Sequence, residues 1–247
     1  MECYEKFAHI YDELINCDID YSCWAHKIIQ LCSEENINKD AYLDLACGTG
    51  NITKYIGKSF RQVWGVDLSS EMLSEAENKL KNTGIRAKLI QQDICSLNLN
   101  KKFDLITCCL DSTNYITDEN NLEEYFKGVY NHLNCNGIFV FDINSYYKIS
   151  EILGNNIYHF DNDDVVYIWD NEFNKEIVDM FITFFIKSGE LYERFDEQHR
   201  ERAYKDDQIE AILDKTGFTI IKKLDNYTHN KITDTTERIA YFLKKEQ

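Results

Sequence analysis

The pattern of apolar and polar positions divides the chain into a central region and two flanking regions of different character. Between residues 41 and 145, short apolar runs of strand length alternate with longer segments of helical spacing. This alternation predicts a parallel, doubly wound α/β sheet. We expect strands at 41–46, 62–67, 87–91, 103–109 and 137–143, with helices near 50–58, 70–83 and 119–134. In such sheets ligands gather at the carboxyl ends of the strands, so polar residues there are candidate site residues.

The first 40 residues predict two helices that precede the sheet. Apolar residues recur at helical spacing around Phe7, Ile10 and Leu14, and again around Trp24 and Ile28. The aromatic residues Tyr11, Tyr21 and Trp24 have two readings. They either pack on the sheet or lie across the mouth of a ligand site, and the pattern does not separate these alternatives.

Residues 155–204 break the alternation of strands and helices. Three strand-like segments, 165–173, 176–187 and 190–204, are separated by the turn pairs Asn174-Lys175 and Ser188-Gly189. No segment of helical length intervenes, so we expect an antiparallel meander inserted after the fifth strand. A lid is favoured over an extension of the main sheet, because the insertion leaves the chain at the ligand-binding strand ends.

The last 40 residues predict a helix at 206–215 and a closing hairpin. Thr216-Gly217 ends the helix, and the apolar segments 218–224 and 238–244 have the lengths of two antiparallel strands.

The strongest chemical signal is a glycine turn after the first predicted strand. The apolar run at 42–46 leads into Gly48 and Gly50, and a helix-compatible segment follows from Asn51. This strand, turn and helix start allow the backbone to approach an adenosine ligand closely. Asp67 follows Gly48 by 19 residues, at the end of the second strand, where an acidic side chain suits the two ribose hydroxyls.

Two cofactor classes use such a turn, and the residues here favour one of them. A dinucleotide-binding turn carries a third glycine, but this chain has Thr53 at that position. It also has a carboxylate, Asp44, four residues before the first glycine, where it would face a pyrophosphate. S-adenosylmethionine has no phosphate and carries an ammonium group and a sulfonium, so a carboxylate favours it.

Two segments resemble the class I S-adenosylmethionine-dependent methyltransferases. They are Leu-Asp-Leu-Ala-Cys-Gly-Thr-Gly at 43–50 and Gly-Val-Asp-Leu-Ser-Ser-Glu-Met-Leu at 65–73. The resemblance implies a Rossmann-like seven-stranded sheet of order 3-2-1-4-5-7-6, with S-adenosyl-L-methionine as cofactor. It also implies a methyltransferase domain at 1–154 and 205–247, in which 1–40 form a helical cap, and a β lid at 155–204. The N-terminus and lid loosely resemble the small-molecule N-methyltransferase branch.

The resemblance also assigns the cofactor site to residues near the strand ends. Asp93 occupies the position whose carboxylate accepts from the adenine amino group, although a helix N-cap role is also open and both roles can coexist. The expected cofactor-binding residues are Tyr21, Trp24, Asp44, Ala46, Gly48, Gly50, Asn51, Asp67, Leu68, Met72, Gln92, Asp93, Ile94 and Leu110.

The methyl acceptor should lie where the fourth and fifth strands end. The fourth strand leads into the polar cluster at 110–116, which holds Asp111 and Asn114, and the fifth ends in Asn144. A general base is needed only if the acceptor is protonated. The candidates are Tyr11, Asp111, Glu197 and His199. The imidazole of His199 has a suitable pKa near ~6.5 when unperturbed, but its charged strand can also simply face solvent.

Composition narrows the partners and the location. A formal net charge of −16 disfavours nucleic-acid substrates, because phosphates require a basic surface. Nine cysteines without a C-x-x-C pair favour reduced thiols in the cytoplasm and argue against a metal site. We find no run of ~20 apolar residues that would span a membrane, and the N-terminus lacks the pattern of a signal peptide.

The sequence therefore predicts a cytoplasmic methyltransferase that acts on an amine or hydroxyl of a small molecule. Three alternatives stay open: methylation of protein or tRNA, a nicotinamide-dependent oxidoreductase, and a cofactor-binding regulator without an acceptor pocket. The identity of the acceptor and the oligomeric state are not encoded in any motif.

Overall fold

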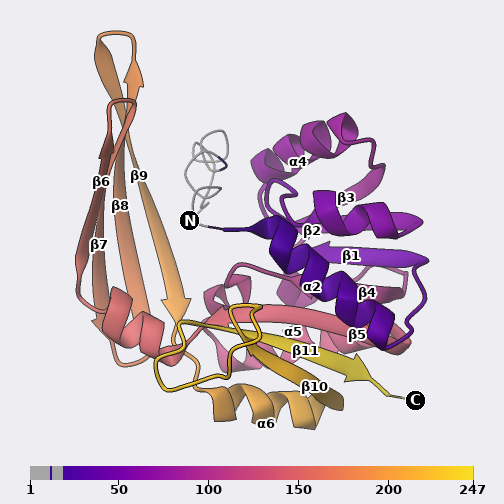
Figure 1. Ribbon diagram of the computed structural model, residues 1–247. Helices are drawn as coiled ribbons and strands as arrows, with labels where there is room; N and C mark the ends of the chain where they lie inside the picture. The colour runs from indigo at the N-terminus through magenta and orange to yellow at the C-terminus, as the bar shows by residue number, and fades with distance from the viewer. Residues whose placement is uncertain (1–11, 13–18, 247) are drawn as a thin grey trace.

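The computed structural model describes Asp12 and residues 19–246, and its centre is a seven-stranded sheet (Figure 1). The parallel strands are β1 (Ala41–Leu45), β2 (Gln62–Asp67), β3 (Ala87–Gln91), β4 (Phe103–Cys108) and β5 (Leu133–Asn144). The hairpin of β10 (Phe218–Asp225) and β11 (Arg238–Lys245) pairs antiparallel with β5. The order β3-β2-β1-β4-β5-β11-β10 confirms the predicted topology.

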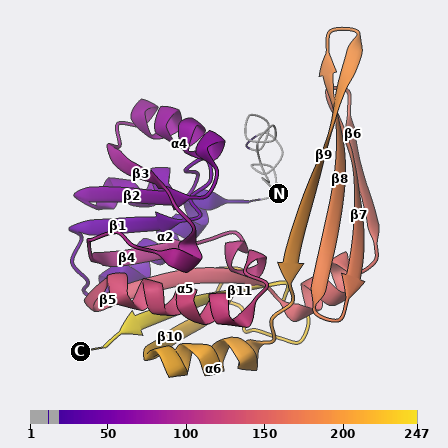
Figure 2. The same ribbon diagram turned by 180° about the vertical axis from the view of Figure 1, so that it is seen from behind.

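Helices cover both faces of this sheet, as Figures 1 and 2 show from opposite sides. On one face α2 (Tyr21–Glu34) and the short α3 (Thr53–Ile56) pack against one apolar core. On the other face α5 (Glu119–His132) and α6 (Asp206–Thr216) pack against a second core. Helix α4 (Ser70–Asn82) lies between β2 and β3 in the chain, and Ser69 caps its start by accepting from the Met72 N–H.

The N-terminal expectations are met only in part within the described residues. The second predicted helix is α2, whose buried side chains recur at helical spacing. The first predicted helix lies outside the described residues, apart from Asp12. No helix in the described part of the chain is long and apolar enough to cross a membrane.

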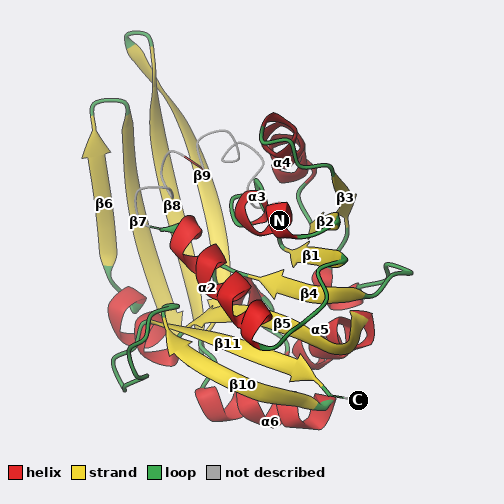
Figure 3. Ribbon diagram, turned by 45° about the vertical axis from the view of Figure 1, so that its right-hand side comes forward, coloured by secondary structure: helices red, strands yellow, loops and turns green. Residues whose placement is uncertain are grey.

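The segment after β5 forms a separate four-stranded antiparallel sheet, which we call the lid sheet (Figure 3). Its strands are β6 (Ile157–Asn162), β7 (Val165–Asn174), β8 (Ile177–Ser188) and β9 (Leu191–Arg202), in sequential order. The three predicted strands are confirmed, and the alternative of an extended main sheet is wrong. Both turns lie one residue later than predicted, at 175–176 and 189–190. β6 was missed because it is a short edge strand that is mostly exposed and shows no apolar alternation.

The lid sheet stands at the carboxyl ends of the parallel strands, beyond the end of β5 (Figures 1 and 2). A π-helical segment, η4 (Lys148–Leu153), joins β5 to it. The lid sheet has a small core of its own with η4, formed by Ile149, Leu153, Val178, Met180 and Ala203. This core is separate from the two cores of the main sheet, so the lid packs as a distinct layer.

Strand β5 begins at Leu133, four residues earlier than predicted. Asn136 has a positive φ of 62°, and the pairing with β4 shifts register between Phe103 and Leu105. A Cβ at Gly137 would lie 2.9 Å from the carbonyl oxygen of Asn134. The Asn-Gly pair therefore forms an irregularity within the strand.

Candidate functional site

A cavity of about 740 Å³ opens at the carboxyl ends of β1 to β4. Its walls come from the start of α2, the glycine turn, the loops after β2, β3 and β4, and the start of α5. This is the edge of a parallel sheet where the loops and helix N-termini create ligand sites.

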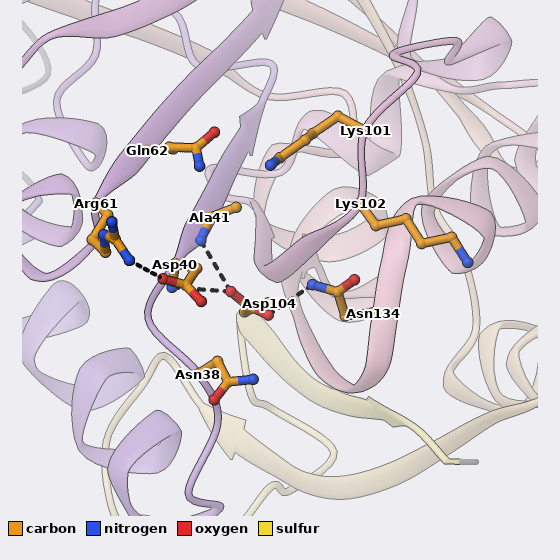
Figure 4. Close-up of a pocket in the computed structure, with 9 residues that line it drawn as sticks. All are labelled: Asn38, Asp40, Ala41, Arg61, Gln62, Lys101, Lys102, Asp104 and Asn134. Atoms are coloured by element: carbon orange, nitrogen blue, oxygen red, sulfur yellow. Dashed lines mark hydrogen bonds and ion pairs between the residues drawn. The ribbon is translucent and has the colours of Figure 1, made fainter.

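A second hollow lies at the opposite edge, where β1 and β4 begin (Figure 4). Its centre is Asp104, whose carboxylate accepts from the N–H groups of Asp40 and Ala41 and from the amide of Asn134. These bonds hold the starts of three strands together. The hollow is therefore explained by structural contacts, and the cavity at the carboxyl edge is the candidate site.

The glycine turn and Asp67 form one hydrogen-bonded unit on the cavity wall. The Gly48 N–H donates to Asp67 Oδ2 at 2.7 Å, and the Ser69 N–H donates to Oδ1 at 2.9 Å. Burial raises the pKa of Asp67, although these backbone donors act in the opposite direction. Gly48 has a positive φ of 52°, and a Cβ there would meet open space. The turn thus leaves room for a ligand beside a fixed carboxylate.

Asp44 lies at the base of the same wall and is fully buried. Its carboxylate accepts from the hydroxyls of Thr53 and Thr107, the latter at 2.7 Å. Burial raises the pKa of Asp44 to about 7, despite these hydrogen bonds. Thr53, which replaces the third glycine of a dinucleotide turn, therefore serves as a donor to the acidic residue of the motif.

Asp12 contacts the glycine turn and α4. Its Oδ1 accepts from Thr49 Oγ1 at 2.7 Å and from Asn51 Nδ2 at 2.8 Å, and its other oxygen pairs with Lys79. Burial raises the pKa of Asp12, but the hydrogen bonds from Lys79, Thr49 and Asn51 outweigh it and lower the pKa overall. Asp12 was not among the predicted site residues, although it is the acidic residue next to Tyr11.

The part of the cavity next to the loops after β2 and β3 is lined by both apolar and polar side chains. Leu68 is 69% exposed there, and Met72, Gln92 and Ile94 also line this region. Asp93 caps the short helix η2 (Ile94–Ser96) by accepting from the Cys95 N–H at 2.8 Å, and it also lines the cavity. The N-cap role of Asp93 is thus confirmed, and its position leaves the adenine role open.

The structure brings together most of the predicted cofactor residues. The cavity is lined by Tyr21, Asp44, Ala46, Gly48, Asn51, Asp67, Leu68, Met72, Gln92, Asp93, Ile94 and Leu110. Ser112 and Tyr115, which were not selected individually, line it as well. Both belong to the polar cluster after β4 that the sequence placed at the methyl position.

Two predicted cofactor residues do not line the cavity, and both contact other parts of the protein. Trp24 lies one turn further along α2 than Tyr21, and its ring stacks on Tyr227 with centroids 4.5 Å apart. Gly50 has a positive φ of 79°, and a Cβ there would contact the side chains of Ala76 and Leu80 in α4. Gly50 therefore permits close helix packing and Trp24 is a core residue.

The turn after β4 holds two consecutive residues in the left-handed region. Leu110 has φ 60° and Asp111 has φ 48°, a conformation that costs free energy for residues with a side chain. The buried carboxylate of Asp142 accepts from both of their N–H groups, at 2.9 and 2.8 Å. Asp142 also accepts from Tyr227 and pairs with Arg238. This network fixes the conformation of the turn beside the cavity.

Asp111, the acidic residue of the turn after β4, forms an ion pair within the protein. Arg238 Nη2 donates to Asp111 Oδ1 at 2.6 Å, and Asp111 does not line the cavity. This placement disfavours Asp111 as a freely available base. Asn114 donates to the carbonyl oxygens of Asn144 and Arg202, at 3.1 and 2.9 Å, so it joins β5 to the foot of the lid sheet.

The inner face of β9 carries three buried polar residues, Glu197, His199 and Glu201. His199 Nδ1 lies 3.2 Å from the hydroxyl of Tyr115. Burial lowers the pKa of His199 to about 4. The solvent-facing interpretation of this strand is therefore wrong, and so is the expectation of an unperturbed imidazole. Tyr11, the remaining catalytic candidate, lies outside the described residues.

Glu201 was missed in the sequence, although a signal for it exists. Glu197, His199 and Glu201 are spaced by two, so on a strand they share one face. The charged neighbours Asp196 and Arg200 are exposed on the other face. Both faces of β9 are polar, so the pattern alone did not show which one was buried.

Comparisons with known proteins show the family to which the chain belongs. Residues 43–137 match the family model described as a methyltransferase domain. The chain is 32% identical over 247 residues to YqeM of Bacillus subtilis (strain 168), a proposed methyltransferase, covering 99% of this chain and 98% of that protein. A crystal structure of an S-adenosylmethionine-dependent methyltransferase from Clostridium acetobutylicum ATCC 824 is 54% identical, with a TM-score of 0.94 and complete coverage of both chains.

More distant relatives share part of the sequence or the fold. A dTDP-amino-sugar N,N-dimethyltransferase of Streptomyces venezuelae, named for dTDP-3-amino-3,4,6-trideoxy-α-D-glucopyranose, is 29% identical over 121 residues, about half of each chain. The crystal structure of Streptomyces venezuelae DesVI has a TM-score of 0.79 at 21% identity and covers 95% of this chain and 97% of its own.

The chain belongs to the class I S-adenosylmethionine-dependent methyltransferases. S-adenosylmethionine is the cofactor of this family, and the cavity fits it. Gly48 leaves space for an adenosine group, Asp67 and Asp93 supply acceptors, and Leu68 and Met72 supply apolar walls. The nicotinamide alternative is excluded by this assignment.

Proposed function

We propose that this protein transfers the methyl group of S-adenosylmethionine to an amine or hydroxyl of a small molecule. The observation that carries the proposal is the contact between Tyr115 and His199. Tyr115 lines the cavity and His199 belongs to the lid sheet, so the polar inner face of the lid meets the cofactor cavity. An acceptor bound between the lid sheet and the cofactor cavity would lie beside the predicted methyl position.

The residues on the cavity wall have separate tasks in this proposal. Asp67 binds the ribose hydroxyls, Asp93 accepts from the adenine amino group, and Asp44 provides negative charge near the ammonium group. The sulfonium supplies an already electrophilic methyl group, so the protein need not activate the donor. Its own contribution is to align the acceptor with the methyl group and to exclude water.

The net charge of the protein and its similarity to known methyltransferases support a small-molecule acceptor in the cytoplasm. A net charge of −16 disfavours binding to nucleic acids. The names of several relatives specify amino-sugar nucleotides as substrates. Seven free cysteines in the described part of the chain are consistent with a reducing compartment. We assign 155–204 to a lid domain and the remainder to the methyltransferase domain.

A transfer assay with methyl-labelled S-adenosylmethionine tests the proposal. The purified protein would be incubated with panels of amines and alcohols, and separately with tRNA and cell protein. We expect label in a small-molecule product. Label only in tRNA or protein would support the macromolecular alternative. Binding of S-adenosylhomocysteine without transfer to any panel would support a regulatory role.

A further inference from the structure

Glu201 is a buried carboxylic side chain that forms no ion pair within the described part of the chain. It is 3% exposed and lies at the foot of β9, next to the end of β5. Asn144 Nδ2 donates to its Oε2 at 3.1 Å, and no described lysine, arginine or histidine lies within ion-pair distance of it. A buried carboxylate without a cation is costly, which suggests that its partner is a ligand.

The amide of Asn144 adds a second unused acceptor at the same place. Asn144 is 4% exposed, and its Oδ1 has no hydrogen-bond partner among the described residues. The two amide atoms share one planar group, so Oδ1 lies beside the carboxylate that Nδ2 contacts. The backbone of Asn144 is held on both sides by Asn114. Asn144 Oδ1 and the Glu201 carboxylate can therefore accept hydrogen bonds from one donor group placed beside them.

Glu201 lies near both acidic and basic side chains. Asp111 and Asp142 pair with the same cation, Arg238, and Lys148 also influences Glu201. Burial raises the pKa of Glu201, and the charge of Asp111 adds to this effect, while Lys148 and Arg238 oppose it. Burial lowers the pKa of Lys148, and so does Arg238. The resulting pKa of about 8 keeps Glu201 mostly protonated near pH 7 without a ligand, and a bound cation would compensate its charge when it ionises.

The short helix η3 (Ser112–Tyr115) joins this place to the cofactor cavity. Its Asn114 holds Asn144, while the next residue, Tyr115, lines the cavity and contacts His199. His199 precedes Glu201 by two residues on the same face of β9. Glu201 and Asn144 are therefore linked through η3 to the wall of the cofactor cavity, although neither of them lines it.

We propose that Glu201 and Asn144 bind the methyl acceptor as an ammonium group, and that Glu201 takes a proton from it. This inference rests on the proposed function and narrows its substrate class to a primary or secondary amine. The ammonium donates N–H bonds to Glu201 and to Asn144 Oδ1, and its charge stabilises the ionised form of Glu201. A hydroxyl would supply no charge.

The proton transfer balances without a further reactant. One N–H bond of the ammonium breaks and an O–H bond forms on Glu201, which leaves a neutral amine and a neutral carboxylic acid. The freed lone pair then forms the new N–C bond as the methyl–sulfur bond breaks. The electron pair of that bond remains on sulfur, which becomes a neutral thioether.

A binding experiment tests the site without relying on turnover. The protein, saturated with S-adenosylhomocysteine, would be titrated with cyclohexylamine and with the uncharged analogue cyclohexanol, by ligand-observed NMR at pH 7. We expect Glu201→Gln to weaken cyclohexylamine binding at least tenfold and to leave cyclohexanol unchanged. Glu201→Asp should recover part of the loss. Glu193→Gln, an exposed glutamate on the same strand and face, should match the wild type.

A carboxyl ¹³C NMR titration provides the second readout. We expect one glutamate signal, absent in Glu201→Gln, to titrate above the usual range and to move to lower pH when cyclohexylamine is added. Equal cyclohexylamine affinity in Glu201→Gln, or no binding to the wild type, would overturn the inference. S-adenosylhomocysteine affinity, measured by calorimetry in every variant, reports folding and the cofactor site. If the wild-type protein does not bind S-adenosylhomocysteine, the proposed function itself is contradicted.

Discussion

Thr53 stands where a dinucleotide-binding turn has its third glycine, and its hydroxyl donates to the buried Asp44. Thr53→Val keeps the shape of the side chain and leaves a buried carboxylate oxygen without this donor. We expect the free energy of unfolding to fall by about 1–3 kcal/mol, measured by urea denaturation. Thr183→Val is the matched control, because it removes an exposed threonine–aspartate hydrogen bond. Its effect should stay within about 0.5 kcal/mol, and equal losses in both variants would contradict the argument.

Asp44 also predicts a dependence of stability on pH. Its pKa is raised to about 7 in the folded protein from 3.8, so the folded state binds the proton more tightly than the unfolded state. The stability that Asp44 contributes is therefore fully present below about pH 4 and is lost as the pH rises through about 7. Asparagine does not titrate. Without ligand, Asp44→Asn should gain stability relative to the wild type between pH 4 and 7, in urea denaturation at a series of pH values. The opposite slope would refute the raised pKa.

Asp67 is the residue whose role was most specific in the sequence, because its spacing from Gly48 suits a ribose. Asp67→Ala should weaken S-adenosylhomocysteine binding by roughly 1.5–3 kcal/mol, through the loss of charge-assisted hydrogen bonds and of the Gly48 contact. Calorimetry measures this directly. Asp161→Ala, an exposed change on the lid sheet, should leave the affinity unchanged. An unaltered affinity in Asp67→Ala would remove the ribose assignment.

At the scale of elements, β11 stabilises the turn after β4 through Arg238. This side chain is buried and pairs with Asp111 and Asp142, which come from two different parts of the chain. Arg238→Met leaves both carboxylates without their cation, and we expect a loss of about 3–5 kcal/mol in the free energy of unfolding. Arg61→Met breaks the exposed pair with Asp40 shown in Figure 4 and should cost at most about 1 kcal/mol. Similar losses in the two variants would mean that burial does not decide the strength of these pairs.

Elements that repeat a strong pattern were predictable, and those that depend on neighbours were not. The ends of β2 and β3 were predicted to the residue, because apolar runs bounded by polar residues define them. The early start of β5 depends on a bulge, and β6 exists because β7 offers it an edge. Site residues whose burial depends on neighbouring elements were equally difficult to predict from the sequence. Glycine spacing located the cofactor residues, but the burial of His199 and Glu201 depends on which face of β9 meets the main sheet.

At the scale of the whole molecule, the cofactor cavity and the lid sheet are built from different parts of the chain. Every described residue that lines the cavity lies between Tyr21 and Asn121, whereas the lid sheet runs from Ile157 to Arg202. The lid sheet also has its own small core, separate from the two cores that flank the main sheet. Under the proposed function, the main sheet holds the methyl donor and the lid sheet encloses the acceptor.

This division predicts different consequences for binding and for turnover when the lid is removed. Replacing residues 157–202 by a short glycine–serine linker should preserve measurable S-adenosylhomocysteine binding, because the cavity walls remain. It should abolish methyl transfer, since His199 and Glu201 are lost and water enters the acceptor side. Calorimetry and the methyl-transfer assay measure the two properties, and circular dichroism checks that the main sheet is folded. If the shortened protein is folded but fails to bind, the lid contributes to the cofactor site. If it still methylates the acceptor at the wild-type rate, the acceptor is held by the main sheet alone.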